Sequence, residues 1–318
     1  MLTRRSLLAA PAVLAGARIP AAFAKAPLSG VASPAVHRFK VGAFEVTGIS
    51  DGTIPLGLEL FPAAQKEPDT TARLLSQSAL SPGPIRSFVN TFLVNTGDRL
   101  ILVDTGTGPD KSFGPDLGKQ PRHLEAAGVA PAAIDVVVIT HLHPDHTGGL
   151  APGGQVAFPN AELVVAEAEY AFWNDAGIAA QAPADVKVFF KVAQDATKPY
   201  ASRLRRVGQG EIVAGLTAVP APGHTPGHLA VRVSSGTEQL LIWGDVVHVA
   251  ALQFDRPDWS IAFDTDQAVA AQTRRRLLDM VAADRIPVAG MHLPFPGVGQ
   301  VVRRGDAYGY VPQLWPSG

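Results

Sequence analysis

The chain has 318 residues, of which 47% are hydrophobic and 17% are charged, so the composition is that of a folded globular protein and excludes a disordered one. The formal net charge is −1 and no basic stripe runs along the sequence, which argues against a nucleic-acid partner. The absence of cysteine excludes a thiolate metal site, a cysteine nucleophile and a disulfide.

The first 24 residues resemble an export signal. Thr3-Arg-Arg-Ser-Leu-Leu8 is similar to the twin-arginine motif, and Ala22-Phe-Ala24 fits a small-x-small cleavage site. Arg18 interrupts the apolar segment between them, which is too short to span a membrane. We therefore expect a signal peptide, a periplasmic or secreted protein without stable membrane insertion, and a single domain over residues 25–318. A plain cytoplasmic tail is the alternative.

After a loose lead-in over residues 25–40, apolar runs that end in turn residues predict strands in the first half of the chain. These strands cover residues 41–49, 88–94, 99–104, 134–139 and 161–165. Residues 54–84 are rich in Pro, Ser and Gln, which predicts a loop with a short helix over residues 71–77 that could cover a site. Further helices are expected over residues 121–127 and 168–174.

The second half repeats this order of strands followed by a helix, after a mixed segment over residues 176–196. Strands are expected over residues 211–219, 229–234, 239–243 and 286–290, the last of them closing the sheet. The clearest helix spans residues 265–284, and its Arg274-Arg-Arg276 is interpreted as a solvated face. Two such blocks predict an α/β fold in which two facing sheets carry helices outside, a four-layer αββα sandwich.

A dense group of titratable residues follows the predicted strand over residues 134–139. It consists of His141, His143, Asp145 and His146. Three imidazoles and a carboxylate so close together are not tolerated uncompensated in an apolar core. They stand at the end of a buried strand, where α/β folds usually carry their chemistry. This ligand set suits zinc, manganese, iron or cobalt.

Three more segments place candidate ligands where strands end. They contribute His224, Asp245 and His292. Together with the first group they provide enough ligands for two ions with open positions for water and substrate. A hydrogen-bonded structural role is the alternative for each of the three. His228 is left over, and we expect it to donate to the backbone or a carboxylate and to orient a ligand.

The ordered set H-x-H-x-D-H, His, Gly-Asp and His resembles the metallo-β-lactamase superfamily over most of residues 41–300. The resemblance implies two divalent ions, most simply zinc, that share a bridging hydroxide as the nucleophile. One ion would be bound by His141, His143 and His224. The other would be bound by Asp145, His146 and His292, with Asp245 as the bridge. Proteins that the chain resembles commonly form homodimers.

Within the superfamily the chain is most similar to the exported branch that includes methyl parathion hydrolase and related lactonases. Phe113, Trp173 and Phe190 stand where that enzyme has an aromatic pocket, although ordinary core packing is the alternative for them. Ile261 and Phe263 are expected to add a further apolar wall.

One position departs from the related homoserine-lactone lactonases, which commonly have a tyrosine three residues after the bridging aspartate. Here that position is His248, which could donate to a lactone oxygen or protonate a leaving group. The alternative is a supporting or merely solvated histidine. Asp145 is a second candidate for delivering the proton. His37 and His123 lie in polar contexts and are expected at the surface.

The resulting hypothesis is a dinuclear metal-dependent hydrolase of neutral, apolar lactones or aryl esters. Hydrolysis of organophosphate triesters is the alternative, since the same centre could attack phosphorus in line. A non-catalytic binding protein stabilised by metal is a third interpretation, and the complete ligand set argues against it.

Overall fold

The computed structural model describes residue 30 and residues 32–314, so the predicted signal peptide lies outside the described residues. The chain divides into two units, Met1–Ser33 and Pro34–Gly318, and the architecture below is that of the second unit. Nowhere in the described part of the chain is there a helix of the length and apolarity needed to cross a membrane.

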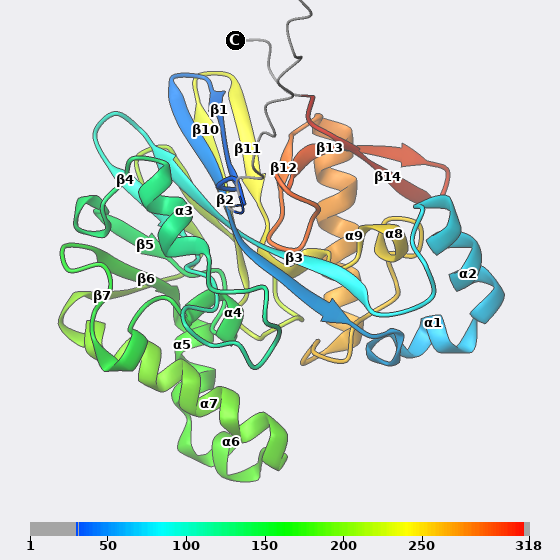
Figure 1. The fold of residues 1–318 in the computed structure, drawn as a ribbon, viewed down its shortest axis with the longest axis horizontal. Coiled ribbons are helices and arrows are strands. Elements are labelled where there is room, and N and C mark those ends of the chain that lie inside the picture. The colour runs from blue at the N-terminus through cyan, green and yellow to red at the C-terminus, as the bar shows by residue number, and fades with distance from the viewer. Residues whose placement is uncertain (1–29, 31, 315–318) are drawn as a thin grey trace, which may run out of the picture. The chain divides into compact units, whose positions relative to one another are not determined.

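Two seven-stranded sheets make up this unit (Figure 1). The first contains β1 (Val36–Val41), β2 (Phe44–Leu56), β3 (Ile85–Asn95), β4 (Leu100–Val103), β5 (Val136–Val138), β6 (Glu162–Ala166) and β7 (Leu204–Val207). These strands follow one another in chain order, antiparallel from β1 to β4 and parallel from β4 to β7. The carboxyl ends of β4 to β7 therefore meet at one edge, where the histidine-rich stretch begins.

The second sheet has the order β14-β13-β12-β11-β10-β9-β8. Its strands are β8 (Gly210–Val213), β9 (Leu216–Pro220), β10 (Leu229–Ser235), β11 (Glu238–Ile242), β12 (Val288–Ala289), β13 (Val298–Arg304) and β14 (Ala307–Pro312). Neighbouring strands are antiparallel except β11 and β12, which pair in parallel. Because of that pairing, the segments after β11 and β12 emerge side by side.

Helices flank both sheets (Figure 1). They are α1 (Pro62–Lys66), α2 (Pro68–Gln77), α3 (Gln120–Ala126), α4 (Pro144–Thr147), α5 (Glu167–Asn174), α6 (Ala176–Gln181), α7 (Ala184–Thr197), α8 (Ala250–Gln253) and α9 (Gln267–Asp284). Short 3-10 helices cover Leu58–Leu60, Pro131–Ala133, Pro152–Gly154, Lys198–Arg203 and Gly244–Val246. Residues of α3, α5 and α7 share one buried cluster with the first sheet, and residues of α9 share another with the second.

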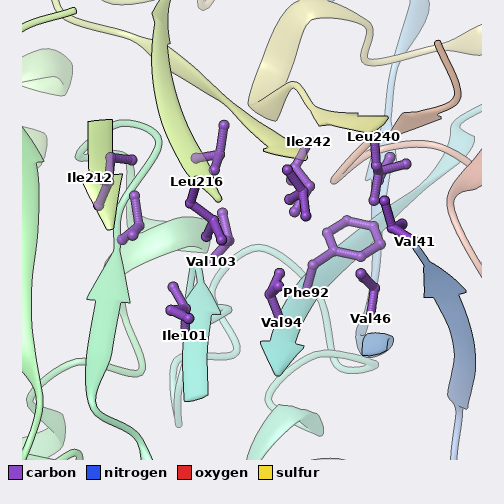
Figure 2. Packing of buried hydrophobic residues seen from close by; sticks show 14 of the residues in the cluster. Val41, Val46, Phe92, Val94, Ile101, Val103, Ile212, Leu216, Leu240 and Ile242 are labelled. Carbon is purple, nitrogen blue, oxygen red and sulfur yellow. The ribbon is translucent and has the colours of Figure 1, made fainter. Parts of the chain in front are cut away.

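The strands alternate between two buried faces. In β3, Phe92 and Val94 point into the cluster between the sheets, whereas Leu93 joins the cluster under the helices. In β11, Leu240 and Ile242 likewise face the first sheet, as Figure 2 shows. Side chains that alternate in this way fill a helix–sheet–sheet–helix arrangement. The predicted four-layer αββα sandwich is therefore confirmed.

Several element boundaries differ from the predictions. The lead-in contains β1, which turns at Gly42 (φ +58°) into β2, and β2 continues through Asp51-Gly52 with an irregularity in its register. The strand predicted over residues 211–219 is a hairpin that turns at Gly215 (φ +84°). Helices α6 and α7 occupy most of the segment that was expected to be mixed. The strand at residues 288–289 is not the last, because β13 and β14 follow it.

Replacing Phe92 with alanine tests the packing between the sheets. Phe92 is fully buried in that cluster (Figure 2), so we expect Phe92→Ala to lower the free energy of unfolding by about 3–5 kcal/mol, as removal of a buried aromatic side chain usually does. Urea unfolding followed by circular dichroism measures the change. Val302→Ala is the control, since Val302 is 38% exposed and its truncation should alter stability by at most about 0.5 kcal/mol. Equal losses in both variants would contradict the assigned core.

Candidate metal centre

The histidine-rich stretch leaves β5 and turns directly into α4, with His143 at its N-cap. This turn is held by Asp104, which follows β4 and has an unusual left-handed backbone (φ +59°). The Asp104 carboxylate accepts hydrogen bonds from the amide and hydroxyl of Thr140, both at 2.8 Å, and from Nδ1 of His146 at 2.7 Å. A strained residue that is held by several bonds often marks a functional site.

Four ligand atoms converge on a first position, from His141, His143, His224 and Asp245. They lie within 4.8 Å of one another. His143 Nδ1 is 3.1 Å from His141 Nε2 and 3.0 Å from His224 Nε2, and Asp245 Oδ2 is 3.3 Å from that same His224 nitrogen. Such convergence of ring nitrogens and a carboxylate fits one divalent ion.

A second position is formed by Asp145, His146, Asp245 and His292, whose ligand atoms also lie within 4.8 Å of one another. His146 Nε2 is 3.4 Å from Asp145 Oδ2 and 3.2 Å from Asp245 Oδ1. His292 Nε2 is 3.5 Å from Asp145 Oδ2 and 3.0 Å from Asp245 Oδ2. Asp245 belongs to both positions, so the structure brings all seven predicted ligands together and places this carboxylate between the two groups.

The burial of two ligand atoms shows, independently of any family resemblance, that these residues fit bound metal ions. His146 Nε2 and Asp245 Oδ1 are buried, yet neither makes a hydrogen bond within the described residues. A buried polar atom without a hydrogen bond carries a desolvation penalty, which their mutual contact at 3.2 Å offsets only in part. A cation held between these residues would remove the rest of that penalty. The two groups therefore fit a dinuclear metal site.

Each of the four predicted metal ligands that turn Nε2 inward has its Nδ1 bound on the other side. Nδ1–H of His224 donates to Asp264 at 2.8 Å, and that of His292 donates to the carbonyl of Phe88 at 2.6 Å. His146 donates to Asp104 as described above, and His141 donates to the hydroxyl of Thr140 at 3.1 Å. These bonds fix the tautomer that presents Nε2 to a metal and raise the basicity of that nitrogen.

His228 supports the bridging aspartate, in agreement with the prediction for it. Its Nδ1–H donates to the carbonyl of Ala221 at 2.8 Å, and its Nε2 accepts the backbone N–H of Asp245 at 3.1 Å. Burial lowers the pKa of His228 to about 3, so the ring stays neutral and keeps this tautomer. The position before the bridge must be glycine, because Gly244 has φ +58° and a Cβ there would lie 2.3 Å from His228 Nε2.

Glu169, on α5, was not recognised from the sequence. Its buried carboxylate accepts hydrogen bonds from the amides of Leu142 (2.8 Å) and Gly227 (2.9 Å), the hydroxyl of Thr225 (2.6 Å) and the indole N–H of Trp173 (2.7 Å). It thereby joins the loop of His141 and His143 to the loop of His224 and His228. In sequence it looks like an ordinary acidic residue in the first turn of a helix, so no local signal distinguishes it.

The charges of the centre depend on one another. Burial alone raises the pKa of Asp245, but the surrounding imidazoles outweigh it and hold this pKa well below its usual range. Burial and the neighbouring imidazoles lower the pKa of His141 and His143. Both rings are therefore neutral at pH 7, which is the form that binds a metal.

The centre opens into a cavity of about 650 Å³. Of the predicted pocket residues, Phe113, Trp173 and Phe263 line it, as does His248. Phe190 and Ile261 do not: both are buried in the core, and their neighbours Phe189 and Ala262 line the cavity instead. For Phe190, which lies on α7, the reason is that consecutive residues on a helix point about 100° apart.

Three further expectations about exposure are wrong. His123 is buried, with Nδ1 2.7 Å from the carbonyl of Ser50, and His37 is buried and stacks on Phe39. Arg274 of α9 is only 1% exposed, although Arg274-Arg-Arg276 was interpreted as a solvated face. The sequence around a polar residue does not show whether another segment of the fold buries it.

The matches to known proteins agree with this geometry. The chain matches the Metallo-beta-lactamase superfamily over residues 84–292. It belongs to that family. A crystal structure of the hydrolase AbOPH, described as in the beta lactamase superfamily, has a TM-score of 0.85 and 30% identity, covering 90% of this chain and 100% of that one. AidC, a dizinc quorum-quenching lactonase in complex with a homoserine product, has a TM-score of 0.82 and 26% identity, covering 89% and 99%.

The sequence relatives match over a smaller share of this chain. The probable metallo-hydrolase Rv2300c of Mycobacterium tuberculosis is 29% identical over 210 residues, which cover 58% of this chain and 64% of that protein. The N-acyl homoserine lactonase of Bacillus thuringiensis is 27% identical over 180 residues, covering 51% and 64%. The chain thus spans less than two thirds of the length of these curated relatives.

Replacing the bridging carboxylate tests the centre. Asp245→Asn removes one negative charge from both metal positions, so we expect less than two ions per chain and a loss of turnover of about 100-fold or more. Metal content is measured by mass spectrometry after dialysis, and folding by circular dichroism. Glu45→Gln, at a surface ion pair with Arg38, is the matched control and should retain both ions. Unchanged metal content and turnover in Asp245→Asn would show that the centre is assigned wrongly.

Proposed function

We propose that this protein is a dinuclear metal-dependent hydrolase of neutral, apolar lactones or aryl esters, with zinc as the metal. The observation that carries the proposal is the lining of the cavity next to the metal ligands. Among the described residues that line it there is no lysine or arginine, whereas Leu56, Leu60, Phe113, Phe172 and Phe189 present apolar surface. Apart from the proposed ions, the described lining offers no cationic partner to an anionic substrate, so a neutral substrate with an apolar or aryl group fits best.

Bound divalent ions would supply Lewis-acid polarisation of the carbonyl and a water of lowered pKa. The chain's own residues hold and orient the reacting groups. Asp145 lines the cavity and has one carboxylate oxygen toward His146 and His292, so it is the second candidate for delivering a proton to the leaving group. The apolar walls exclude water from the substrate and strengthen electrostatic interactions within the cavity.

His248 is the proposed donor to the leaving group. It lines the cavity, Nε2 lies 3.2 Å from Asp245 Oδ2, and neither ring nitrogen makes a hydrogen bond within the described residues. Burial lowers the pKa of His248 to about 4. At neutral pH the ring is therefore uncharged, and it would act as a neutral N–H donor to the leaving alkoxide or phenoxide rather than as an imidazolium.

The relatives support this reaction class. AidC and the Bacillus thuringiensis relative are named as lactonases, and AbOPH as a hydrolase. The second candidate is hydrolysis of organophosphate triesters, as in methyl parathion hydrolase. It is favoured by the aromatic residues Phe113 and Trp173 in the lining, since these can stack on an aryl leaving group.

The proposal also includes the cellular setting of the enzyme. We propose that residues 1–24 direct twin-arginine export of the folded, metal-loaded domain over residues 25–318 to the periplasm or outside the cell. The motif around Arg4 and Arg5 supports this route, because it carries folded proteins. A homodimer is proposed from the resemblance to related lactonases.

A substrate panel distinguishes the candidates. Zinc-loaded protein is assayed on an aryl lactone, an acyl homoserine lactone, a phenyl ester and an aryl phosphotriester. We expect kcat/KM for the lactones or the phenyl ester to exceed that for the phosphotriester by about tenfold or more, a difference of ~1.4 kcal/mol in transition-state stabilisation. A preference for the phosphotriester would reverse the ranking. Fully loaded protein that turns over none of the four would indicate a non-catalytic, metal-stabilised binding protein.

The role of His248 depends on the leaving group. We expect His248→Phe to lower kcat by about 100-fold on an alkyl lactone, whose developing alkoxide depends strongly on a hydrogen-bond donor, and much less on a 4-nitrophenyl ester. His248→Tyr restores a hydrogen-bond donor and is expected to recover part of the lactone activity. Equal losses on both substrates, or no gain from tyrosine over phenylalanine, would assign His248 a purely structural role.

A further inference from the structure

Arg274 is a buried cation that the hydrolytic mechanism does not use. It lies on α9, is 1% exposed, and is surrounded by backbone rather than by solvent. Nε donates to the carbonyl of Val246 at 2.6 Å, and Nη1 donates to the carbonyls of Pro257 at 2.8 Å and Trp259 at 3.4 Å. Nη2 lies 3.5 Å from the carboxylate of Asp264. A guanidinium is suited to such a task, because its five donors have a fixed planar geometry.

The first of these contacts is to the residue next to the bridging aspartate. Val246 follows the bridging Asp245, so the guanidinium holds the end of the short helix that carries the bridge. Asp264 reaches the centre from the other side, since it accepts Nδ1–H of His224 at 2.8 Å. Arg274 is thus linked to two ligands on separate loops through one intervening residue each: to Asp245 through Val246, and to His224 through Asp264.

The same guanidinium also holds the wall of the cavity. The segment over residues 257–265 has no regular secondary structure, and Ala262, Phe263, Asp264 and Thr265 within it line the cavity. Arg274 contacts this segment at its start, at Trp259 and at Asp264.

Trp259 extends the connection to His248. Its carbonyl also accepts Nε2–H of Gln253 at 2.9 Å, and Oε1 of Gln253 accepts the backbone N–H of His248 at 2.7 Å. The wall and the proposed donor therefore share a hydrogen-bonded frame with Arg274 at its centre.

We propose that Arg274 is a positioning residue of the hydrolytic site: it fixes the wall over residues 257–265 against the loop of Asp245, and thereby sets both the orientation of His224 and the shape of the substrate cavity. Only the expected effect of Arg274 on turnover rests on the proposed function. Its effect on the metal ligands follows from the contacts themselves. A buried arginine of purely structural importance would alter stability without a selective effect on metal retention or on KM.

The test compares Arg274→Lys and Arg274→Met with the matched control Arg275→Lys. Arg275 is the next residue of α9, pairs with Asp258 of the same segment at the exposed surface, and touches none of the metal ligands. Three readouts are taken on metal-loaded protein: the rate of zinc release to a chelator, the visible spectrum of the cobalt-substituted protein, and KM and kcat for a bulky aryl ester.

For Arg274→Lys and Arg274→Met we expect zinc release to accelerate by about 10–100-fold, the usual effect of losing a partner that orients a ligand. The cobalt spectrum should shift, and KM for the bulky ester should rise by a larger factor than kcat falls, because the wall is displaced. Lysine should recover little, since it cannot reproduce the planar fork. Arg275→Lys should match the wild type in all three readouts.

Asp264→Asn separates the two effects. It weakens the support of His224 but leaves the bonds of Arg274 to Val246 and Pro257, so zinc release should accelerate while KM changes little. Wild-type zinc release, spectrum and KM in folded Arg274→Lys would overturn the proposal. If both Arg274 variants fail to fold, unchanged zinc release and spectrum in Asp264→Asn would overturn it. A wild type that hydrolyses neither lactones nor esters would refute the proposed function, while zinc release and the cobalt spectrum still decide the role of Arg274.

Discussion

The buried carboxylate of Asp245 is the interaction on which the centre depends. Five imidazole nitrogens lie between 3.0 and 3.6 Å from its two oxygens. Burying such a charge is costly unless opposite charge and hydrogen bonds compensate it. The imidazoles come from the loop after β5 in the first sheet and from loops after β9, β11 and β12 in the second. The centre therefore forms only when both sheets have packed on the core between them.

The ligands are held rigidly because the buried charge of Asp245 must be compensated. His141, His146, His224 and His292 each present Nε2 and are held at Nδ1 by a carbonyl, a carboxylate or a hydroxyl, so little reorganisation is needed when a cation binds. Glu169 and Arg274 act one layer further out. Glu169 joins loops that belong to different sheets, and Arg274 joins the loop of Asp245 to the cavity wall. Both are buried charges that bind backbone groups, which explains how irregular loops can hold ligands accurately.

The sequence was most informative where local pattern and chemistry coincide. Apolar runs that end in His or Asp identified the strands and the candidate ligands, because strand ends and ligand types are local properties. The roles of Glu169 and Arg274 could not be predicted. An acid in the first turn of a helix and an arginine within a run of arginines are usually solvent-exposed, and only the tertiary structure shows that both are buried here. Phe190 was predicted to line the cavity in place of its neighbour Phe189, because the face that α7 turns to the cavity depends on how that helix packs. The turns at Gly42 and Gly215 were missed because single glycines occur in strands as well.

The balance of charge explains why the site demands cations and yet suits a neutral substrate. The carboxylates of Asp145, Asp245 and Asp264 all have lowered pKa values despite burial, so they remain ionised. Burial disfavours the charged form of His146, His224 and His292, but the nearby carboxylates prevail and raise the pKa of each ring. Without metal, these three rings bind protons on the same nitrogens that would bind the metal ions. Two divalent ions in place of those three protons change the net charge of the centre by only one unit, and the described lining of the cavity has no basic side chain that would bind an anionic substrate.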